Sequence, residues 1–440
     1  MWPYHPDLLA RPVPRYTSYP TAAEFGDQVG HDDMAAALDT VGADSMVSLY
    51  LHIPYCRAIC WYCGCNTGAA NRTARLDAYL TRLHEEIDMV AARLDERGRI
   101  GRIAFGGGSP NAIAPDAFAA LVAHLRSAFA CQDAPMSLEV DPRGFDRDWA
   151  SVIAETGVTR VSLGVQTFDP VLQAAIGRVQ PHEDIVRTVT LLRDAGVGSI
   201  NFDLMYGLPG QDDAALEATL ADSIALAPER LAVFGYAHVP HLIPRQRRID
   251  ATALPGAAAR FVQAALAHER LTAAGYRAVG FDHFAKPDDS LAQAAVDGTL
   301  RRNFQGFTDD PADILIGLGA SAISEFPDCL LQNAKNAGDW HRAIGAGRFA
   351  TARGIRRTPI DRRRGAAIAG VLCQGVAETD GLPERDAIRT RLFRFEQAGL
   401  LGWEGHRLRL TQDALPYARS IAAAFDAWRS ADDKHFSHAV

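Results

Sequence analysis

Between residues 48 and 240 the sequence alternates short apolar runs with longer amphipathic stretches, and this alternation limits the possible fold more than any other feature. Six runs are rich in β-branched or aromatic residues and end at Gly, Pro or a polar residue, as strands do. An intervening stretch, 76–94, carries apolar residues at helical spacing. Strands that alternate with helices predict βαβ units and a parallel sheet. The six predicted strands are 48–53, 102–107, 137–140, 160–165, 199–206 and 230–236.

Six such units predict an α/β fold of a particular kind, a partial (β/α)6 barrel of the TIM type. An open, doubly wound sheet is the alternative. Two further apolar runs, 278–284 and 314–323, are expected to act as a seventh and an eighth strand that extend the sheet.

The C-terminal part of the chain changes character. Residues 361–400 have the pattern of two helices, and residues 400–411 that of a hairpin before a last helix, an order that resembles a winged-helix module. Basic charge is not concentrated on any one element, so a lid or packing role is favoured over DNA binding. The sequence therefore predicts three parts: an N-terminal segment that wraps the barrel, a catalytic domain, and a smaller, mostly helical lid domain, at 1–45, 46–330 and 331–440.

Charge and hydropathy exclude several classes of partner. The chain has 45 Lys and Arg against 53 Asp and Glu, a net charge of −8, so no global field attracts nucleic acid or an anionic membrane. The first residues lack the basic and apolar regions of a secretory peptide. The longest charge-free apolar stretch, Ile314–Ser324, is far shorter than the roughly 20 residues that span a bilayer. We expect a cytoplasmic monomer with no nucleic-acid or membrane partner.

Four of the seven cysteines lie within ten residues, directly after the first predicted strand. Cys56, Cys60, Cys63 and Cys65 form a C-x3-C-x2-C-x-C motif. The loop at the C-terminal end of a strand is where barrels of this type build their chemistry. A disulfide framework would spread its cysteines in pairs and belongs to an oxidising compartment. The tight group therefore indicates metal binding or redox chemistry.

The spacing favours an iron–sulfur cluster. A structural zinc site usually takes two separated ligand pairs and fills all four positions. Here Cys56, Cys60 and Cys63 crowd one loop, and soft thiolates of this kind suit an iron–sulfur cluster. Three ligands would leave one iron open, as a catalytic metal requires. Zinc and a thiol redox loop remain the alternatives, and Cys65 is ambiguous as a fourth ligand because it lies so close to Cys63.

Polar groups recur at the ends of the predicted strands. Three glycines, Gly106 to Gly108, precede Ser109 after the second strand and let the backbone approach a ligand closely. Singly, each polar group would be a helix cap or a satisfied buried residue. Together they ring one mouth of the barrel, which suits a ligand with amino, carboxylate, ribose and adenine groups. The groups at the later strand ends are Glu139, Gln166, Asp203, and Tyr236 with Ala237.

These motifs resemble those of the radical S-adenosylmethionine (SAM) superfamily. A longer series is similar to one of its families, the oxygen-independent coproporphyrinogen III oxidases (dehydrogenases). The cysteine motif alone marks only the superfamily, whereas YTSYPTA, the fourth cysteine and NFQG are narrower signals. The C-terminal hundred residues match poorly. The matching stretches include PRYTSYPTA (14–22), SLYLHIPYC (48–56), CWYCGCN (60–66), GGGSP (106–110), EVDPR (139–143), GVQTFD (164–169), DLMYGLP (203–209), YAHVP (236–240), DHFAKPDD (282–289) and RNFQGF (302–307).

The resemblance implies one 4Fe-4S cluster on Cys56, Cys60 and Cys63, with Cys65 and Tyr50 taking part in catalysis. It implies two SAM molecules as well. The first would be bound by residues after several strands: Tyr50, Tyr62, Gly107, Glu139 and Ile323. The second would be bound by Gly108, Ser109, Gln166, Arg178, Asp203 and Ala237, with Phe304 and Gln305 close by.

The implied reaction is the oxidative decarboxylation of two propionates of coproporphyrinogen III to vinyl groups. It gives protoporphyrinogen IX for haem biosynthesis by way of a 5′-deoxyadenosyl radical. A flavodoxin or ferredoxin would supply the electron. A haem chaperone of the same superfamily and a radical SAM methyltransferase are the competing interpretations. Since a net-acidic protein must meet four substrate carboxylates with local cations, we expect at least one substrate-binding residue among Arg245, Arg247, Arg248, Arg301 and Arg302.

Overall fold

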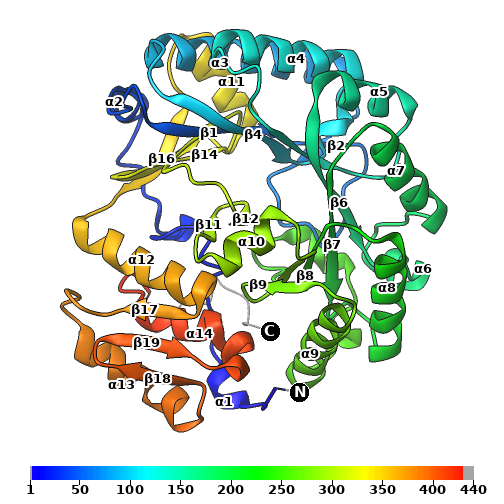
Figure 1. Cartoon of the computed structure of the whole chain (residues 1–440). Coiled ribbons are helices and arrows are strands. Elements are labelled where there is room, and N and C mark those ends of the chain that lie inside the picture. Colours follow the sequence, from blue (N-terminus) through cyan, green and yellow to red (C-terminus); the bar gives the residue numbers. More distant parts are fainter. Residues whose placement is uncertain (1, 430–440) are drawn as a thin grey trace.

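The centre of the molecule is one twelve-stranded sheet, whose order is β16-β15-β14-β13-β1-β4-β5-β6-β7-β8-β10-β9. The structure is a computed structural model and describes residues 2–429. Six consecutive strands are parallel and form the curved inner wall seen in Figure 1, as the sequence predicts for a partial barrel. They are β1 (Met46–Ile53), β4 (Arg99–Gly107), β5 (Met136–Val140), β6 (Val158–Gln166), β7 (Ser199–Tyr206) and β8 (Arg230–Gly235).

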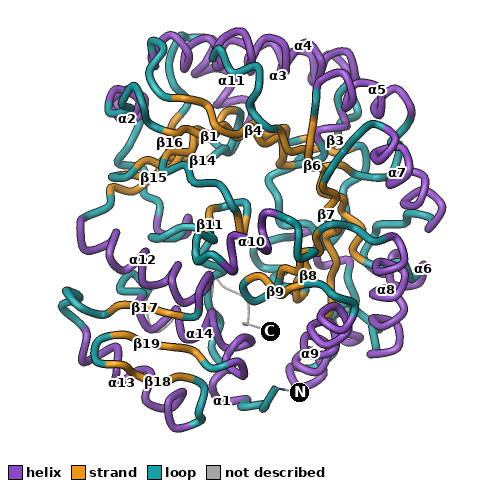
Figure 2. Tube along the Cα trace, in the orientation of Figure 1, coloured by secondary structure: helices purple, strands orange, loops and turns teal. Residues whose placement is uncertain are grey.

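Helices cover the outer face of this sheet, and Figure 2 shows them as an arc around the strands. On the first of them, Leu83, Ile87 and Val90 recur at helical spacing, and all three are fully or almost fully buried. Their burial against the sheet is the reason why the periodic stretch folds as a helix. The covering helices are α3 (Thr73–Leu94), α4 (Pro115–Ala128), α5 (Arg147–Thr156), α6 (Pro170–Ala175), α7 (His182–Asp194), α8 (Asp213–Leu226) and α9 (Ala257–Ala273).

The inner face of the sheet carries polar side chains where it lines a cavity, as β7 shows. In β7 the buried residues Ile200, Phe202 and Leu204 belong to the hydrophobic core, whereas Asn201 and Asp203 line a cavity. This two-residue alternation is the normal pattern of a strand whose faces meet different surroundings. The barrel interior is therefore a lined cavity and not a packed core.

The extension of the sheet differs from the sequence prediction at both edges. The expected seventh strand, 278–284, is in fact two short antiparallel strands, β9 (Arg277–Val279) and β10 (His283–Ala285). The chain turns at Gly280, whose φ of +59° favours glycine and whose missing side chain makes room for the ring of Phe307.

At the other edge, the expected strand 314–323 ends early. The strand β13 (Ile314–Leu318) pairs with β1 in parallel, and the chain then reverses through Gly319, with φ +96°, into β14 (Ile323–Phe326). Two more antiparallel strands follow in the same sheet, β15 (Cys329–Asn333) and β16 (Thr351–Arg356), separated by α11 (Ala337–Gly345). The sheet thus continues past residue 330, where the sequence placed the end of the catalytic domain.

The smaller C-terminal unit has the helices and the hairpin that the sequence predicts. Between the two helices lies a short strand that was not expected, and it joins the hairpin in a three-stranded sheet. The elements are α12 (Pro359–Gln374), β17 (Val376–Glu378), α13 (Arg385–Gln397), β18 (Leu401–Glu404), β19 (Arg407–Leu410) and α14 (Ala418–Ala422).

The N-terminal segment links this unit to the barrel. Its helix α2 (His31–Asp39) reaches the edge strand β16, where Asp33 pairs with Arg356. Further back in the segment, the hydroxyl of Tyr16 donates to Asp426 at 3.0 Å in the C-terminal unit. The segment also contains α1 (Pro6–Leu9) and the short turn η1 (Ala22–Glu24).

Candidate active site: a cysteine loop at the mouth of the barrel

The cysteine loop leaves the C-terminal end of β1, and short-range pairing holds both of its ends. The strand β2 (Tyr55–Cys56) pairs with β3 (Gly68–Ala69) and so closes the loop at its base. Near the middle, the backbone N–H of Trp61 donates to the carbonyl of Ile176 at 3.1 Å. All seven cysteines are free thiols. The loop is therefore fixed by the backbone and leaves its sulfurs available as ligands.

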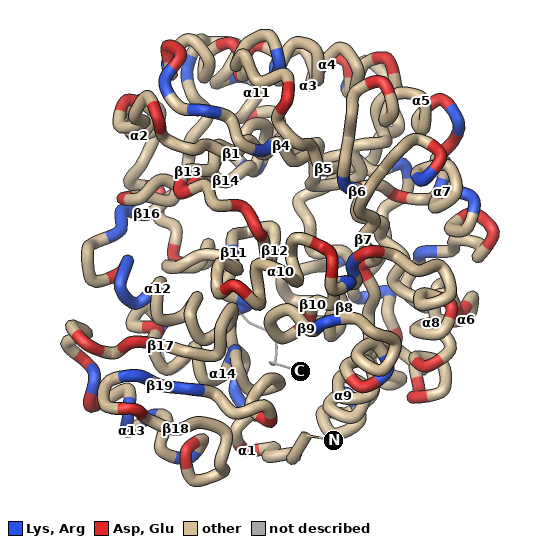
Figure 3. The backbone as a smooth tube through the Cα atoms, in the orientation of Figure 1, with Lys and Arg blue, Asp and Glu red and all other residues tan. Residues whose placement is uncertain are grey.

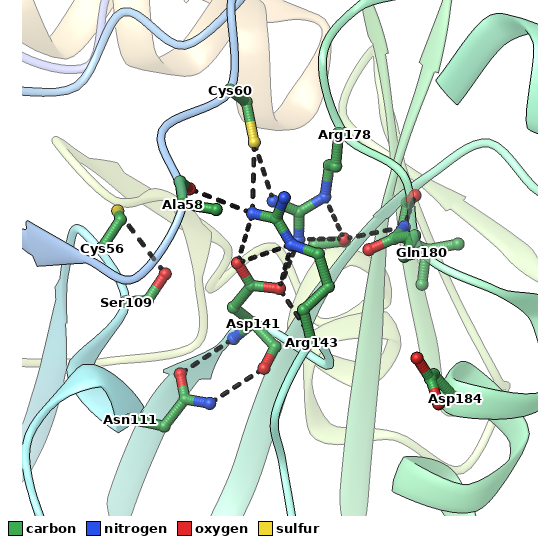
Figure 4. Close-up of polar contacts among 12 residues, drawn as sticks. Cys56, Ala58, Cys60, Ser109, Asn111, Asp141, Arg143, Arg178, Gln180 and Asp184 are labelled. Carbon is green, nitrogen blue, oxygen red and sulfur yellow. Dashed lines mark hydrogen bonds and ion pairs between the residues drawn. The ribbon is translucent and has the colours of Figure 1, made fainter. Parts of the chain in front are cut away.

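Hydrogen-bond donors converge on two of the three predicted ligand sulfurs. The Sγ of Cys60 accepts from Arg178 at 3.2 Å and from Arg143 at 3.4 Å, as Figure 4 shows. The Sγ of Cys56 lies 3.1 Å from the hydroxyl of Thr67 and accepts from Ser109 at 3.6 Å. Donors at these distances stabilise negative charge on sulfur. At Cys56 burial nevertheless raises the pKa of the thiol, so the two hydroxyl donors offset only part of the cost of a buried thiolate, which is the form that binds metal.

A buried carboxylate orients the two guanidinium groups. Asp141 accepts a hydrogen bond from Arg143 at 2.6 Å and forms a 3.3 Å ion pair with Arg178. Its backbone is held in turn by Asn111, which donates to the carbonyl at 2.8 Å and accepts from the N–H at 3.0 Å. Burial would raise the pKa of Asp141, but the two guanidinium groups together lower it below its ordinary value. The carboxylate thus stays charged and holds both arginines on Cys60.

The last two cysteines of the motif interact with each other. The thiol of Cys65 donates to Cys63, and this hydrogen bond lowers the pKa of Cys63 to about 6 while it raises the pKa of Cys65. The backbone N–H of Cys65 also donates to the Cys63 sulfur, at 3.4 Å. Cys63 is thus the thiolate of the pair and Cys65 the thiol.

A cavity of about 570 Å³ opens beside this loop. It brings together five of the residues that the sequence assigned to cofactor binding, along with the two cysteines. At its floor Glu139 accepts from the backbone N–H of Gly107 at 3.1 Å. Burial raises the pKa of Glu139 to about 7, and the neighbouring Asp203 adds to the shift. The predicted residues in the lining are Tyr50, Cys63, Cys65, Gly107, Glu139, Phe304 and Gln305.

Sequence reasoning missed a histidine in this cavity. His52 lies two residues after Tyr50 on β1, and its Nδ1 is 3.1 Å from the Tyr50 hydroxyl. Its Nε2 is 3.3 Å from the hydroxyl of Ser321. Burial lowers the pKa of His52 to about 4, so the ring is neutral. The two-residue spacing from Tyr50 was the available signal, because alternate strand residues share a face.

A second cavity, of about 290 Å³, lies deeper in the barrel. Asp203 lines it from within β7, and not from the strand end where the sequence placed it. Its carboxylate accepts from Ser162 at 3.1 Å and from Asn201 at 2.9 Å. Glu139 and Gln305 line both cavities. The two cavities therefore meet at these residues.

The remaining predicted cofactor residues surround the cysteine loop. Ser109 and Arg178 contact the sulfurs described above, and Gln166, with φ +67°, lies beside Arg178. The carbonyls of Tyr62 and Ala237 both accept from Gln246, at 3.0 Å each. The last two predicted residues are Gly108 and Ile323. The N–H of Gly108 donates to the carbonyl of Ile53, and Ile323 is the first residue of β14.

The structure separates the five arginines that the sequence grouped as candidate substrate ligands. Arg245 lines the large cavity. Arg247 and Arg248 are exposed. Arg301 pairs with Asp313, and Arg302 lies over the ring of Phe307 at 4.5 Å. Only Arg245 of this group reaches the cavity that Cys63 and Glu139 line.

Comparison with known proteins identifies the family of this chain. Residues 50–222 match the radical SAM superfamily model. The chain is 43% identical to the oxygen-independent coproporphyrinogen III oxidase of Bradyrhizobium diazoefficiens, over 97% of each chain. It is 38% identical to that of Pseudomonas aeruginosa, over 97% of this chain and 96% of the relative. The chain belongs to the oxygen-independent coproporphyrinogen III oxidase family.

A solved structure from the same family supports this assignment. The coproporphyrinogen III oxidase of Escherichia coli, described as a radical SAM enzyme, superposes with a TM-score of 0.91 and 32% identity. The match covers 97% of this chain and all of that one. The extended partial barrel is thus the fold of this oxidase family. Within residues 2–429, no helix is both long and apolar enough to cross a membrane.

A radical SAM protein uses a 4Fe-4S cluster and SAM, and the residues at the loop of this oxidase fit the cluster. Three thiols leave one loop; an arginine donates to the sulfur of Cys60, and the hydroxyl of Thr67 contacts that of Cys56. Among the residues that the structure describes, no three His, Cys, Asp or Glu side chains converge on a single metal ion. The loop's spread of sulfurs agrees with a cluster, in which each cysteine binds a different iron.

Proposed function

We propose that this chain converts coproporphyrinogen III to protoporphyrinogen IX without oxygen, by oxidative decarboxylation of two propionates. The observation that carries the proposal is the three-thiol loop beside a cavity lined by Tyr50, Gly107 and Glu139, in a chain that matches this oxidase family over its full length. When bound, the cluster and SAM would supply a 5′-deoxyadenosyl radical that removes a hydrogen atom from the propionate. The resulting carbon radical then loses carbon dioxide and passes one electron to an acceptor, which leaves the vinyl group.

The chain's own residues bind and orient the reactants. Cys56, Cys60 and Cys63 hold the cluster. Glu139 and the backbone around Gly107 offer an acceptor and a donor beside the loop, which suits the amino and carboxylate groups of a first SAM. Tyr50, held by neutral His52, lies on the same wall and has a hydroxyl whose pKa burial raises well above its ordinary value. It therefore stays protonated and can donate to a reactant.

Residues further from the first site serve a second SAM and the substrate. Ser109 and Arg178 contact the cysteine sulfurs, Gln166 lies beside Arg178, and Asp203 lines the deeper cavity. The remaining ligands proposed for this second SAM are Gly108, Ala237, Phe304 and Gln305, and those for the first are completed by Tyr62 and Ile323.

For a substrate carboxylate the structure favours Arg245. It lines the large cavity, and no ion pair involves it among the described residues. One of its buried nitrogens also lacks a hydrogen-bond partner. A guanidinium in this position is free to bind a carboxylate in two-pronged geometry.

The decisive experiment is a product analysis under anaerobic conditions. The reconstituted chain is incubated with coproporphyrinogen III, SAM and dithionite, and porphyrin products and carbon dioxide are measured. We expect loss of two carboxyl groups per substrate, and no product from Cys63→Ala. The matched control is Cys131→Ala, a buried cysteine outside the loop, which should retain activity.

Other outcomes would contradict the proposal in distinct ways. Tight haem binding without release of carbon dioxide would assign the chain to the haem chaperones. A methylated product together with S-adenosylhomocysteine would assign it to the methyltransferases.

A further inference from the structure

Exposed cations lie around the cysteine loop, and one of them, Lys335, also lines the large cavity. Although the chain has a net charge of −8, four basic residues lie around this loop, and we call them the cationic rim. They come from the loop itself, from the short turn η3 (Pro244–Arg248) and from the loop after β15. All four are exposed: Arg57, Arg247, Arg248 and Lys335.

Specific contacts hold the rim against the loop. The guanidinium of Arg248 lies 5.8 Å from the ring centre of Trp61. The turn that carries Arg247 and Arg248 is tied to the loop by Gln246, whose amide donates to the carbonyl of Tyr62 at 3.0 Å. On the other side, the amide of Asn66 donates to the backbone carbonyl of Lys335 at 2.8 Å. The position of the rim is therefore coupled to that of the sulfurs.

The charges of the rim are not neutralised within the described chain. In residues 2–429 none of the four has an ion pair, whereas some exposed arginines elsewhere, such as Arg342 and Arg356, do. Figure 3 shows acidic and basic residues intermixed along the outer helices. An unpaired group of one sign beside a redox loop is thus a local feature, and it creates a positive potential there.

Exposed apolar side chains accompany these cations. Leu242 is 47% exposed and Val179 is 61% exposed, both high values for large hydrophobic residues. Leu242 precedes Ile243, which packs against Gly64 of the loop. Val179 follows Arg178, which contacts Cys60. Apolar side chains beside charged ones are the usual composition of a surface that binds another protein.

We propose that the cationic rim binds an acidic one-electron carrier protein, which delivers the electron that reduces the cluster. The inference rests on the proposed function, because only a redox cluster needs such a partner. One electron leaves the reduced centre of the carrier and enters the cluster, and no atom is transferred. Arg247 and Arg248 line neither of the two cavities and are assigned to the donor protein, whereas Arg245 and Lys335 line the large cavity and Arg245 is assigned to the substrate.

The test compares two electron donors on the reconstituted full chain. Cluster reduction is followed anaerobically by the loss of absorbance, with either reduced flavodoxin or dithionite as donor. The variant Arg247→Glu/Arg248→Glu reverses two rim charges. Its control, Arg99→Glu/Arg277→Glu, makes the same change in net charge with two exposed, unpaired arginines at the starts of β4 and β9, the opposite end of the strands.

We expect reduction by flavodoxin to be at least about tenfold slower in the rim variant at low salt, with reduction by dithionite unchanged. The control should keep the wild-type rate with both donors. High salt should slow the wild type toward the rim variant, because screening removes the attraction.

Equal slowing in the rim and control variants, an unchanged flavodoxin rate, or parallel slowing with dithionite would overturn the proposal. The proposed decarboxylation is tested separately, because dithionite supports it without a carrier protein. Loss of product with dithionite would therefore refute the enzyme function, while the docking result could still be read from cluster reduction.

Discussion

The two ends of the barrel each contain an aspartate between two arginines, but the two networks differ in what else the arginines contact. At the N-terminal end of the strands, Asp309 accepts from Arg102 at 2.7 Å and from Arg160 at 3.0 Å. At the C-terminal end, Asp141 holds Arg143 and Arg178.

At the N-terminal end of the strands, here called the lower end, the guanidinium nitrogens donate only to oxygen atoms, those of Asp309, Thr308 and Ser290. The C-terminal end is called the upper end. At the upper end both guanidinium groups also donate to the sulfur of Cys60. At the N-terminal end the arginines and Asp309 hold one another on the wall of the deeper cavity, whereas at the C-terminal end the arginines are directed at a predicted metal ligand. This agrees with the general division of barrels into a stabilising face and a catalytic face.

The largest effect is expected from removal of the Cys60 sulfur, which both arginines at the C-terminal end contact. We expect Cys60→Ala to lose the cluster and all decarboxylation, because the upper arginines then have no thiolate to stabilise. Iron and sulfide content after anaerobic reconstitution, together with the absorbance spectrum, measures the loss. Retention of a full cluster in this variant would mean that Cys60 is not a ligand.

A change in the network at the N-terminal end should lower stability and leave the cluster itself unchanged. Asp309→Asn leaves Arg102 and Arg160 without their anion, and we expect the free energy of unfolding to fall by about 4 kcal/mol near neutral pH. Hydrogen bonds and charge from these arginines hold the pKa of Asp309 well below its ordinary value, although burial opposes them. The carboxylate therefore contributes stability at neutral pH that is lost as the pH falls below about 4.

The wild type and Asp309→Asn should thus converge in denaturant titrations at acidic pH. Their cluster content after reconstitution should be equal. A change in the cluster spectrum of the folded variant would contradict the assignment of this network to stability.

A third buried carboxylate, Glu86, differs from Asp141 and Asp309 because uncharged groups, and not arginines, donate its hydrogen bonds. Glu86 on α3 accepts from Asn333 at 2.7 Å, from Trp340 at 3.1 Å and from the N–H of Gly319 at 2.6 Å. Burial nevertheless raises the pKa of Glu86 to about 7. The folded state then favours the protonated acid, so stability is present below the ordinary pKa and is lost as the pH rises through 7.

We expect the stability of the wild type relative to Glu86→Gln to fall by about 2–3 kcal/mol as the pH rises from about 4.5 to 8. Thermal or denaturant unfolding across this pH range measures it. A constant difference between the two proteins would show that Glu86 does not titrate in the folded state.

The smallest expected effect is a shift in the midpoint potential of the cluster when one arginine of the upper network is replaced. Arg143→Gln removes one donor to Cys60 but leaves Arg178 and Asp141 in place. Hydrogen bonds to the sulfur ligands stabilise the more negative, reduced cluster, so the midpoint potential should become more negative. A redox titration followed by electron paramagnetic resonance measures the shift.

Arg147→Gln, an exposed residue of α5, is the matched control and should leave the midpoint potential unchanged. An unaltered potential in Arg143→Gln would show that this arginine only holds the loop.

Much of the architecture could be predicted because its signals are local. The β-branched runs, the period of α3 and the cysteine spacing are properties of neighbouring residues. They correctly predicted six parallel strands and the position of the cysteine loop at the end of the first one. The C-terminal helices and hairpin were predicted in the same way. The turn at Gly280 was missed because an apolar run continues through it, and only the packing of Phe307 requires the reversal.

The sequence by itself determined which residues are candidates for cofactor binding and catalysis, and it placed the cysteine loop at the C-terminal end of the first strand. Only the tertiary structure decided which of them meet. Arg143 and Cys60 are 83 positions apart, and Arg178 is 118 positions from the same sulfur. Such contacts depend on strand register and on the curvature of the sheet, which arise from packing across the whole core and leave no local pattern in the chain.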